Sequence, residues 1–128
     1  MILDSSALVA ILLGEPGSRK LSEKVSSARG AGIGVPTLTE TAIVLSARLG
    51  HDARPLVSRF LVESGVVTVP FGDAHFGVAV AAWLRFGKGR HPAGLNFGDC
   101  MAYAVAKVAG EPLLCVGEDF PRTDLPLA

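Results

Sequence analysis

This sequence has few cysteines, no long apolar run and no excess of charge of either sign. Its two cysteines, Cys100 and Cys115, are too few for a disulfide framework, and neither lies in a Cys-x-x-Cys pair. A structural zinc site is therefore not expected, and both thiols are expected to be buried as small apolar groups. No 18-residue stretch is free of charges and helix breakers, which argues against a membrane span. The first residues lack the basic start and apolar run of a signal peptide, so we expect a cytoplasmic protein.

The charges balance at 12 basic and 12 acidic side chains, so the net charge gives no overall hint of a nucleic-acid partner. Apolar residues are abundant instead: 49% of the chain is hydrophobic, and the mean hydropathy is +0.43. In 128 residues this is enough for one core, and it predicts a single domain over residues 1–128.

Short apolar runs alternate with segments of helical periodicity. Strands are expected at 1–3, 33–35, 66–69 and 113–116. Helices are expected at 7–13, 18–28, 37–49, 51–64, 74–86 and 98–109, with a Gly- and Pro-rich loop at 87–97. Ser5 or Ser6 is expected to cap the first helix, and Asp73 the fifth. This alternation predicts an α/β/α sandwich around a mostly parallel sheet of about four to five short strands.

Four carboxylates stand at positions where such a sheet would gather them. Asp4 directly follows the first strand and Asp119 lies just past the last, while Glu40 and Asp99 lie near the starts of two helices. Ligands bind at the carboxyl ends of parallel strands, so we expect these acids to share one crevice. A divalent cation would offset their repulsion, and Mg²⁺ or Mn²⁺ prefers such hard oxygen ligands. A cation held there can activate water for in-line attack on a phosphodiester.

Each acid also has a simpler structural explanation. Asp4 and Asp99 are placed where they can cap helices, and Glu40 fits the last position of a capping box that begins at Thr37. Asp119 and Asp124 lie in a turn-rich tail, where aspartate is common. Taken from spacing alone, the four acids do not identify an enzyme.

Several motifs, taken in order, resemble one known family. They are Met-Ile-Leu-Asp-Ser-Ser-Ala at 1–7, Thr-Glu-Thr-Ala at 39–42, Gly-Lys-Gly-Arg-His-Pro-Ala-Gly-Leu-Asn-Phe-Gly-Asp-Cys at 87–100, and Pro-Leu-Leu-Cys-Val-Gly-Glu-Asp-Phe at 112–120 followed by Thr123-Asp124. Together they look like the PIN-domain toxins called VapC, although residues 51–80 are not distinctive. The resemblance implies a PIN-like fold and an Mg²⁺- or Mn²⁺-dependent endoribonuclease, the toxin of a toxin–antitoxin pair. It also implies a homodimer and a cognate VapB-type antitoxin that blocks the active site.

The same resemblance assigns roles to individual residues. Asp4 and Asp99 would be the principal metal ligands, Glu40 would complete the acidic site, and Asp119 would be the fourth acid. Ser6 would support them, and Asp124 could approach the site with a lower rank than Asp119. All of these positions carry the matching residue type.

A basic segment precedes Asp99. No Asp or Glu occurs between Trp83 and Gly98, whereas the basic side chains there are Arg85, Lys88, Arg90 and His91. We expect these four to contact RNA phosphates, with a solvated basic loop as the alternative. The aromatic residues Trp83, Phe86 and Phe97 could stack on RNA bases or, more commonly for such residues, pack in a core or dimer face.

The sequence alone leaves three other functions open. A metal-dependent phosphatase of small phosphate esters would use the same acids without needing the basic loop. A non-catalytic protein-binding module would show no metal-dependent cleavage, and DNA presents the same phosphates as RNA.

Overall fold

The computed structural model describes all 128 residues and contains one four-stranded sheet. Its strands are β1 (Ile2–Leu3), β2 (Ala31–Gly34), β3 (Val66–Val69) and β4 (Leu113–Leu114). Their order is β3-β2-β1-β4, and every neighbouring pair is parallel. The predicted parallel sheet of short strands is confirmed. All four strands therefore end at the same edge, where the crossover connections begin.

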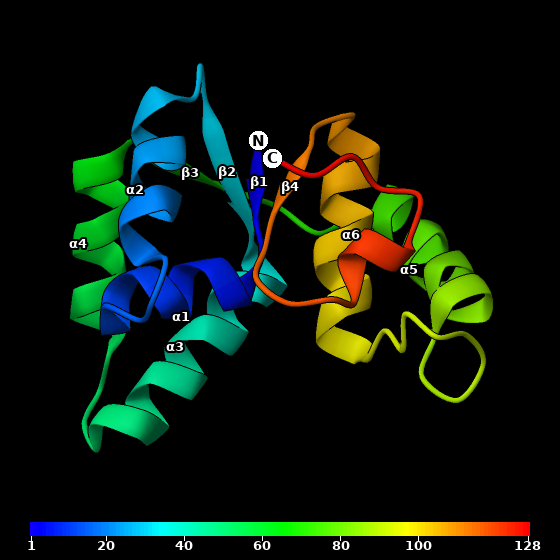
Figure 1. The fold of residues 1–128 in the computed structure, drawn as a ribbon, viewed down its shortest axis with the longest axis horizontal. Coiled ribbons are helices and arrows are strands. Elements are labelled where there is room, and N and C mark those ends of the chain that lie inside the picture. Colours follow the sequence, from blue (N-terminus) through cyan, green and yellow to red (C-terminus); the bar gives the residue numbers. More distant parts are fainter.

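Helices cover both faces of this sheet (Figure 1). They are α1 (Ser5–Leu13), α2 (Ser18–Ser27), α3 (Val35–Leu49), α4 (Arg54–Ser64), α5 (Asp73–Phe86) and α6 (Phe97–Ala109), with the short 3₁₀ helix η1 (Phe120–Arg122) near the end. In Figure 1, α1 to α4 lie on one side of the strands and α5 and α6 on the other. No helix is long and apolar enough to cross a membrane.

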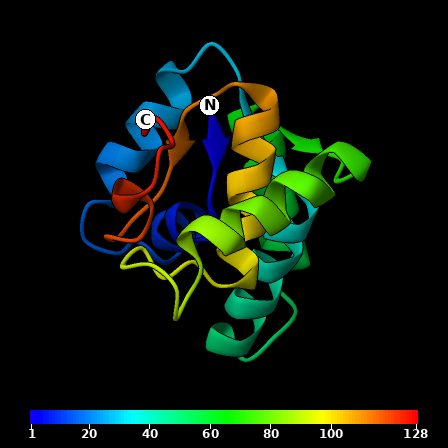
Figure 2. The same ribbon diagram turned by 90° about the vertical axis from the view of Figure 1, so that its right-hand side faces the viewer.

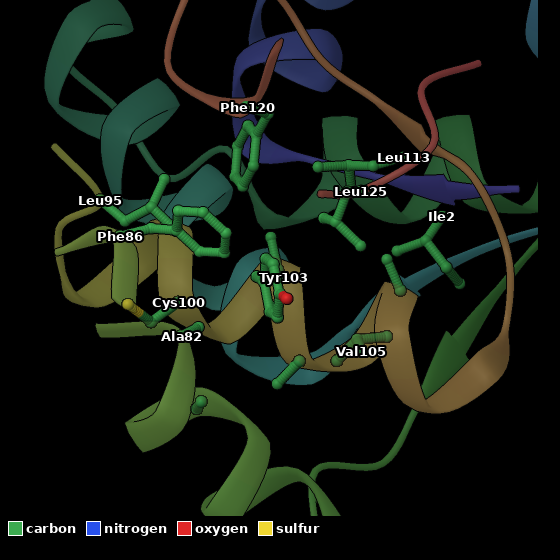
Figure 3. Packing of buried hydrophobic residues seen from close by; sticks show 14 of the residues in the cluster. Ile2, Ala82, Phe86, Leu95, Cys100, Tyr103, Val105, Leu113, Phe120 and Leu125 are labelled. Atoms are coloured by element: carbon green, nitrogen blue, oxygen red, sulfur yellow. The ribbon is translucent and has the colours of Figure 1, made fainter. Parts of the chain in front are cut away.

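Two cores reflect the alternation of side chains along the strands. Ile2 and Leu113 pack with α5, α6 and the C-terminal segment, whereas Leu3 and Leu114 pack with α1, α2, α3 and α4. Neighbouring residues of a strand point to opposite faces, so each two-residue strand serves both layers. Figure 3 shows the first core, with Tyr103 near its centre.

The helix starts differ from those predicted. Helix α3 begins at Val35 with Gly34 as its N-cap, and Pro36 lies in the first turn, where a missing N–H costs nothing. The predicted capping box from Thr37 to Glu40 is therefore wrong, and Glu40 has no capping task. The N-caps of α1 and α5 are Asp4 and Gly72, not the predicted serines and Asp73.

Candidate active site at the carboxyl ends of the central strands

Asp4 leaves the end of β1 and is buried, with 3% of its surface exposed. Its backbone N–H donates to the carbonyl of Leu114 (2.9 Å), which continues the pairing of β1 with β4. Its Oδ2 accepts from the backbone N–H (3.1 Å) and the hydroxyl (2.6 Å) of Ser6. The second carboxylate oxygen, Oδ1, is buried without any hydrogen-bond partner. A buried carboxylate oxygen without a partner is costly, so this atom is available to a ligand.

Ser6 connects Asp4 to the segment that follows β4. Its hydroxyl oxygen donates to Asp4 and accepts from the backbone N–H of Val116 (2.9 Å). The side chain predicted to support the site thus links two strand ends that are 110 residues apart. Burial raises the pKa of Asp4, and the two Ser6 hydrogen bonds act against that rise.

Asp99 lies in the first turn of α6 and has both a structural and an electrostatic role. Its Oδ2 accepts from the backbone N–H of Asn96 (3.1 Å), while Asn96 Oδ1 accepts from the backbone N–H of Asp99 (2.9 Å), which completes a capping box. Burial, and then the charges of Asp4, Asp119 and Glu40, raise the pKa of Asp99 to about 6. These carboxylates are therefore close enough to repel one another.

Glu40 and Asp119 complete the group from two further elements. Glu40 projects from α3, and its carboxylate lies against the backbone of Gly98, the residue before Asp99. Asp119 is exposed and is the N-cap of η1, just past the end of β4. Both charges act on Asp99. The structure thus brings the four predicted acids to one region.

This region fits a hard divalent cation that keeps part of its water shell. Nowhere do three or more His, Cys, Asp or Glu side chains form a ready ligand cluster. Mg²⁺ is usually held by only one or two carboxylates, with water supplying its remaining ligands. The unpartnered Oδ1 of Asp4 and the nearby carboxylate of Asp99 provide this kind of oxygen donor set.

One neighbour of the acids was missed by sequence reasoning. Cys115 follows β4 and is half-buried, so the expectation of full burial holds for Cys100 but not for Cys115. Burial, and then the charges of Asp4 and Asp99, raise the pKa of the Cys115 thiol to about 11. The thiol is neutral at physiological pH, so it adds no negative charge beside Asp4 and Asp99. Only its position after the last strand could have signalled this placement.

The hydrogen bonds of Asp124 lie away from the four acids. Its carboxylate accepts from the hydroxyl of Tyr103 and from the side chains of Lys107 and Arg85. The pairing with these groups holds the pKa of Asp124 below its usual value despite some burial. Asp124 thus binds α5 and α6 directly and does not contact the four acids. Arg85, expected to contact RNA, is engaged in this ion pair.

The other three basic side chains differ in how free they are. Arg90 donates through Nε to the carbonyl of Leu84 (3.1 Å) and lies over the ring of Trp83 (5.0 Å to its centroid). His91 accepts at Nδ1 from the backbone N–H of Ala93 (3.0 Å). Lys88 is exposed and its ammonium has no protein partner. Among the aromatic residues, Phe86 is in the core, whereas Trp83 and Phe97 are 42% and 79% exposed.

The acids lie outside the main cavities of the protein. The largest hollow, about 570 Å³, lies between α3 and α4 and is lined in part by Leu38, Ile43 and Leu61. None of the five principal cavities contains Asp4, Glu40, Asp99 or Asp119. Small-molecule sites are usually concave and bury most of their ligand. None of these five cavities therefore marks the acids as an enclosed small-molecule site.

Comparisons with known proteins agree on one family. Residues 1–125 match the family model described as PIN domain. The chain is 45% identical over 126 residues to a VapC ribonuclease of Mycobacterium bovis, covering 98% of this chain and 91% of the relative. It is 42% identical over 125 residues to a ribonuclease VapC of Mycolicibacterium smegmatis, covering 98% and 97%.

Solved structures share the fold. Mycobacterium tuberculosis VapC20, a Sarcin-Ricin loop cleaving toxin, matches with a TM-score of 0.79 and 18% identity over 99% of this chain and 97% of that one. A toxin–antitoxin complex from Klebsiella pneumoniae contains a chain that matches with a TM-score of 0.73 and 15% identity, over 99% and 95%. At these identities the matches confirm the predicted PIN-like α/β/α architecture alone. The family model and the curated relatives place this chain in the PIN-domain family, among the VapC ribonucleases.

Proposed function

We propose that this protein is the ribonuclease toxin of a toxin–antitoxin pair and that it hydrolyses RNA phosphodiester bonds with Mg²⁺ or Mn²⁺. The observation that carries the proposal is the buried, unpartnered Oδ1 of Asp4 in a group of acids that raises the pKa of Asp99 to about 6. A buried oxygen without a partner, beside a carboxylate with a raised pKa, is typical of a site that binds a ligand. The identity to VapC ribonucleases supports the same activity.

In this proposal each acid has a distinct task. Asp4 and Asp99 would hold the cation, and Glu40 and Asp119 would complete the negative surface around it. When bound, the cation stabilises charge on the phosphate and lowers the pKa of a coordinated water. Ser6 keeps Asp4 Oδ2 occupied and so leaves Oδ1 free, while Asn96 orients Asp99. The carboxylates of Glu40 and Asp119 would orient the attacking water and accept its proton.

The RNA would reach the acids along the loop before α6. Lys88 is the first candidate for a phosphate contact, because its ammonium has no protein partner. Arg90 uses only Nε for Leu84, so its two terminal nitrogens stay available. We assign His91 mainly to shaping the loop, and Arg85 would contact RNA only by leaving Asp124.

We further propose a VapB-type antitoxin and a second copy of the chain as protein partners in the cytoplasm. The chain of the Klebsiella pneumoniae complex that shares this fold comes from a toxin–antitoxin assembly, which supports the first partner. Exposed apolar side chains along α5, including Phe76 (69%) and Leu84 (54%), support a further protein contact. The apolar groove between α3 and α4 offers a second surface of this kind.

The experiment that tests the activity uses purified, antitoxin-free protein and total cellular RNA. Mg²⁺ or Mn²⁺ is expected to give discrete fragments, and EDTA or Asp99→Asn is expected to abolish them. A folded, metal-loaded protein that cuts no RNA would contradict the proposal. Turnover of p-nitrophenyl phosphate without RNA cleavage would favour a phosphatase, and duplex DNA tests the choice of nucleic acid.

A further inference from the structure

A cluster of polar side chains outside the acidic site holds the C-terminal segment to the helices. The carboxylate of Asp124 accepts hydrogen bonds from the hydroxyl of Tyr103 (2.6 Å), from Nζ of Lys107 (2.9 Å) and from Nη1 of Arg85 (3.3 Å). Tyr103 and Lys107 lie one turn apart on α6, and Arg85 is on α5. In Figure 2, α5 crosses in front of α6, and the two helices pack against each other. One carboxylate thereby fixes the segment to both of them.

The same segment carries Asp119 five residues earlier, and the backbone between the two aspartates is tightly turned. The backbone N–H of Arg122 donates to the carbonyl of Asp119 (3.2 Å), and that of Thr123 donates to Phe120 (2.9 Å). Phe120 and Leu125 are buried in the core beside Tyr103 (Figure 3). A shift at Asp124 is therefore transmitted to Asp119, because the turn between them has little freedom to absorb it.

On its other side, Asp119 has a looser connection. The hydrogen bond from Val116 to Ser6 is the last fixed point after β4. Gly117 follows with a φ of +104°, and Glu118 and Asp119 are both exposed. Asp119 makes no capping hydrogen bond through its own side chain. Its place near Asp99 thus depends on what holds the chain downstream.

We propose that Asp124 is a positioning residue, whose bonds to Tyr103 and Lys107 hold the C-terminal turn so that Asp119 stays beside the other three carboxylates. It touches neither the cation nor the RNA and acts only through Asp119. The inference rests on the proposed metal-dependent function. It also explains why an acid that ends the Thr123-Asp124 motif lies outside the acidic cluster. A plain structural anchor would instead affect folding and leave the acidic site unchanged.

The test measures binding of Mn²⁺ alone, from the electron paramagnetic resonance signal of the free ion, to the full-length protein without RNA. Asp124→Asn removes the charge that Lys107 and Arg85 contact, and Tyr103→Phe removes one hydroxyl and is the milder change. Each is expected to weaken Mn²⁺ binding, by about 10-fold for Asp124→Asn, which is the lower end of the effect of groups that lie outside the ligands of a metal site. The matched control is Glu63→Gln, which removes an exposed ion pair with Arg59 on α4. It is expected to leave Mn²⁺ binding unchanged.

The decisive comparison uses Asp119→Asn as the background. If Asp124 acts through Asp119, adding Asp124→Asn or Tyr103→Phe there weakens Mn²⁺ binding no further. The inference is overturned by wild-type affinity in a folded Asp124→Asn protein, or by an equal loss in both backgrounds. If Asp124→Asn fails to fold, the same comparison with Tyr103→Phe tests the inference. A wild-type protein that binds no Mn²⁺ also overturns the inference. RNA cleavage is scored separately: its absence alongside the expected Mn²⁺ pattern contradicts the ribonuclease proposal alone.

Discussion

The carboxylate of Glu40 on α3 lies directly against the backbone of Gly98 on α6, one residue before Asp99. A Cβ atom built on Gly98 would fall 2.9 Å from Cδ of Glu40, which is closer than real contacts allow. The absent side chain at Gly98 therefore leaves the space in which Glu40 approaches Asp99. A side chain added at Gly98 should therefore disturb the acidic site without lowering the stability of the fold.

Gly98→Ala is expected to lower RNA cleavage by about 10-fold, because a displaced carboxylate loses only part of the roughly 100-fold or more that an acid–base group contributes. The added methyl group pushes away only the flexible end of Glu40. The alanine favours the helix by roughly 0.5–1 kcal/mol, so thermal stability should hold or rise. Single-turnover cleavage and thermal unfolding check the two parts.

The matched control is Gly77→Ala, in the interior of α5, where a Cβ meets nothing within 4 Å. It should raise stability similarly and leave cleavage unchanged. Loss of activity in both variants would contradict the role given to Gly98.

Ser6→Ala removes the hydroxyl that donates to Asp4 and accepts from Val116. The free energy of unfolding should fall by about 1–3 kcal/mol, because buried polar groups lose their partner. The hydroxyl hydrogen bond of Ser6 lowers the pKa of Asp4, so its loss should move the acidic limb of the cleavage profile to higher pH, while the backbone N–H of residue 6 keeps its bond to Asp4. Urea unfolding and cleavage between pH 5 and 8 measure these effects.

Ser26→Ala provides the comparison, since its hydroxyl is exposed and donates to a carbonyl of its own helix. An unchanged pH profile in Ser6→Ala, with stability lowered as expected, would give Ser6 a structural role only.

The sequence predicts the layers and the acids well for a physical reason. The period of apolar residues reports which face of an element is buried, and Asp4 and Asp119 stand next to strand ends wherever those strands lie. Helix starts were less well predicted, because capping depends on local backbone geometry. Thr37 and Glu40 match a capping box in spacing, but Pro36 lets α3 begin earlier.

The partners of long polar side chains could not be read from the sequence at all. Asp124 contacts Tyr103, Lys107 and Arg85, which are 17 to 39 residues away along the chain. Such contacts depend on how α5 and α6 pack. The sequence therefore predicted the basic segment correctly, but it could not show which of its basic side chains have a protein partner. The unpartnered Oδ1 of Asp4 is likewise a property of the folded surroundings.

Stability of the metal-free protein should depend on Asp99 in a defined pH window. Its folded pKa of about 6 lies above the usual pKa of an aspartate, so the folded state binds the proton more tightly than the unfolded state. This contribution to stability is complete below the unfolded pKa and is lost as the pH rises through about 6. The contribution of Asp99 is measured as the difference in unfolding free energy between the wild type and Asp99→Asn, from urea unfolding in EDTA.

The difference in unfolding free energy between these two proteins should therefore change between pH 4 and 7, the variant becoming relatively more stable. Mg²⁺ should reduce the wild-type loss by offsetting the repulsion among the acids. A pH-independent difference would mean that Asp99 is not crowded by Asp4, Glu40 and Asp119.

Lys88→Ala is expected to weaken RNA binding while leaving the chemical step intact. Its ammonium has no protein partner, so removing it should cost little stability. Each phosphate contact on a single strand releases about 0.7 of a counterion, so the slope of log affinity against log salt should fall by about 0.7. KM should rise several-fold at low salt with kcat unchanged. Arg19→Ala, which removes one exposed charge on α2, is the control. An equal change of slope in both variants would mean that overall charge attracts the RNA, whereas a change confined to Lys88→Ala would place a phosphate at the loop before α6.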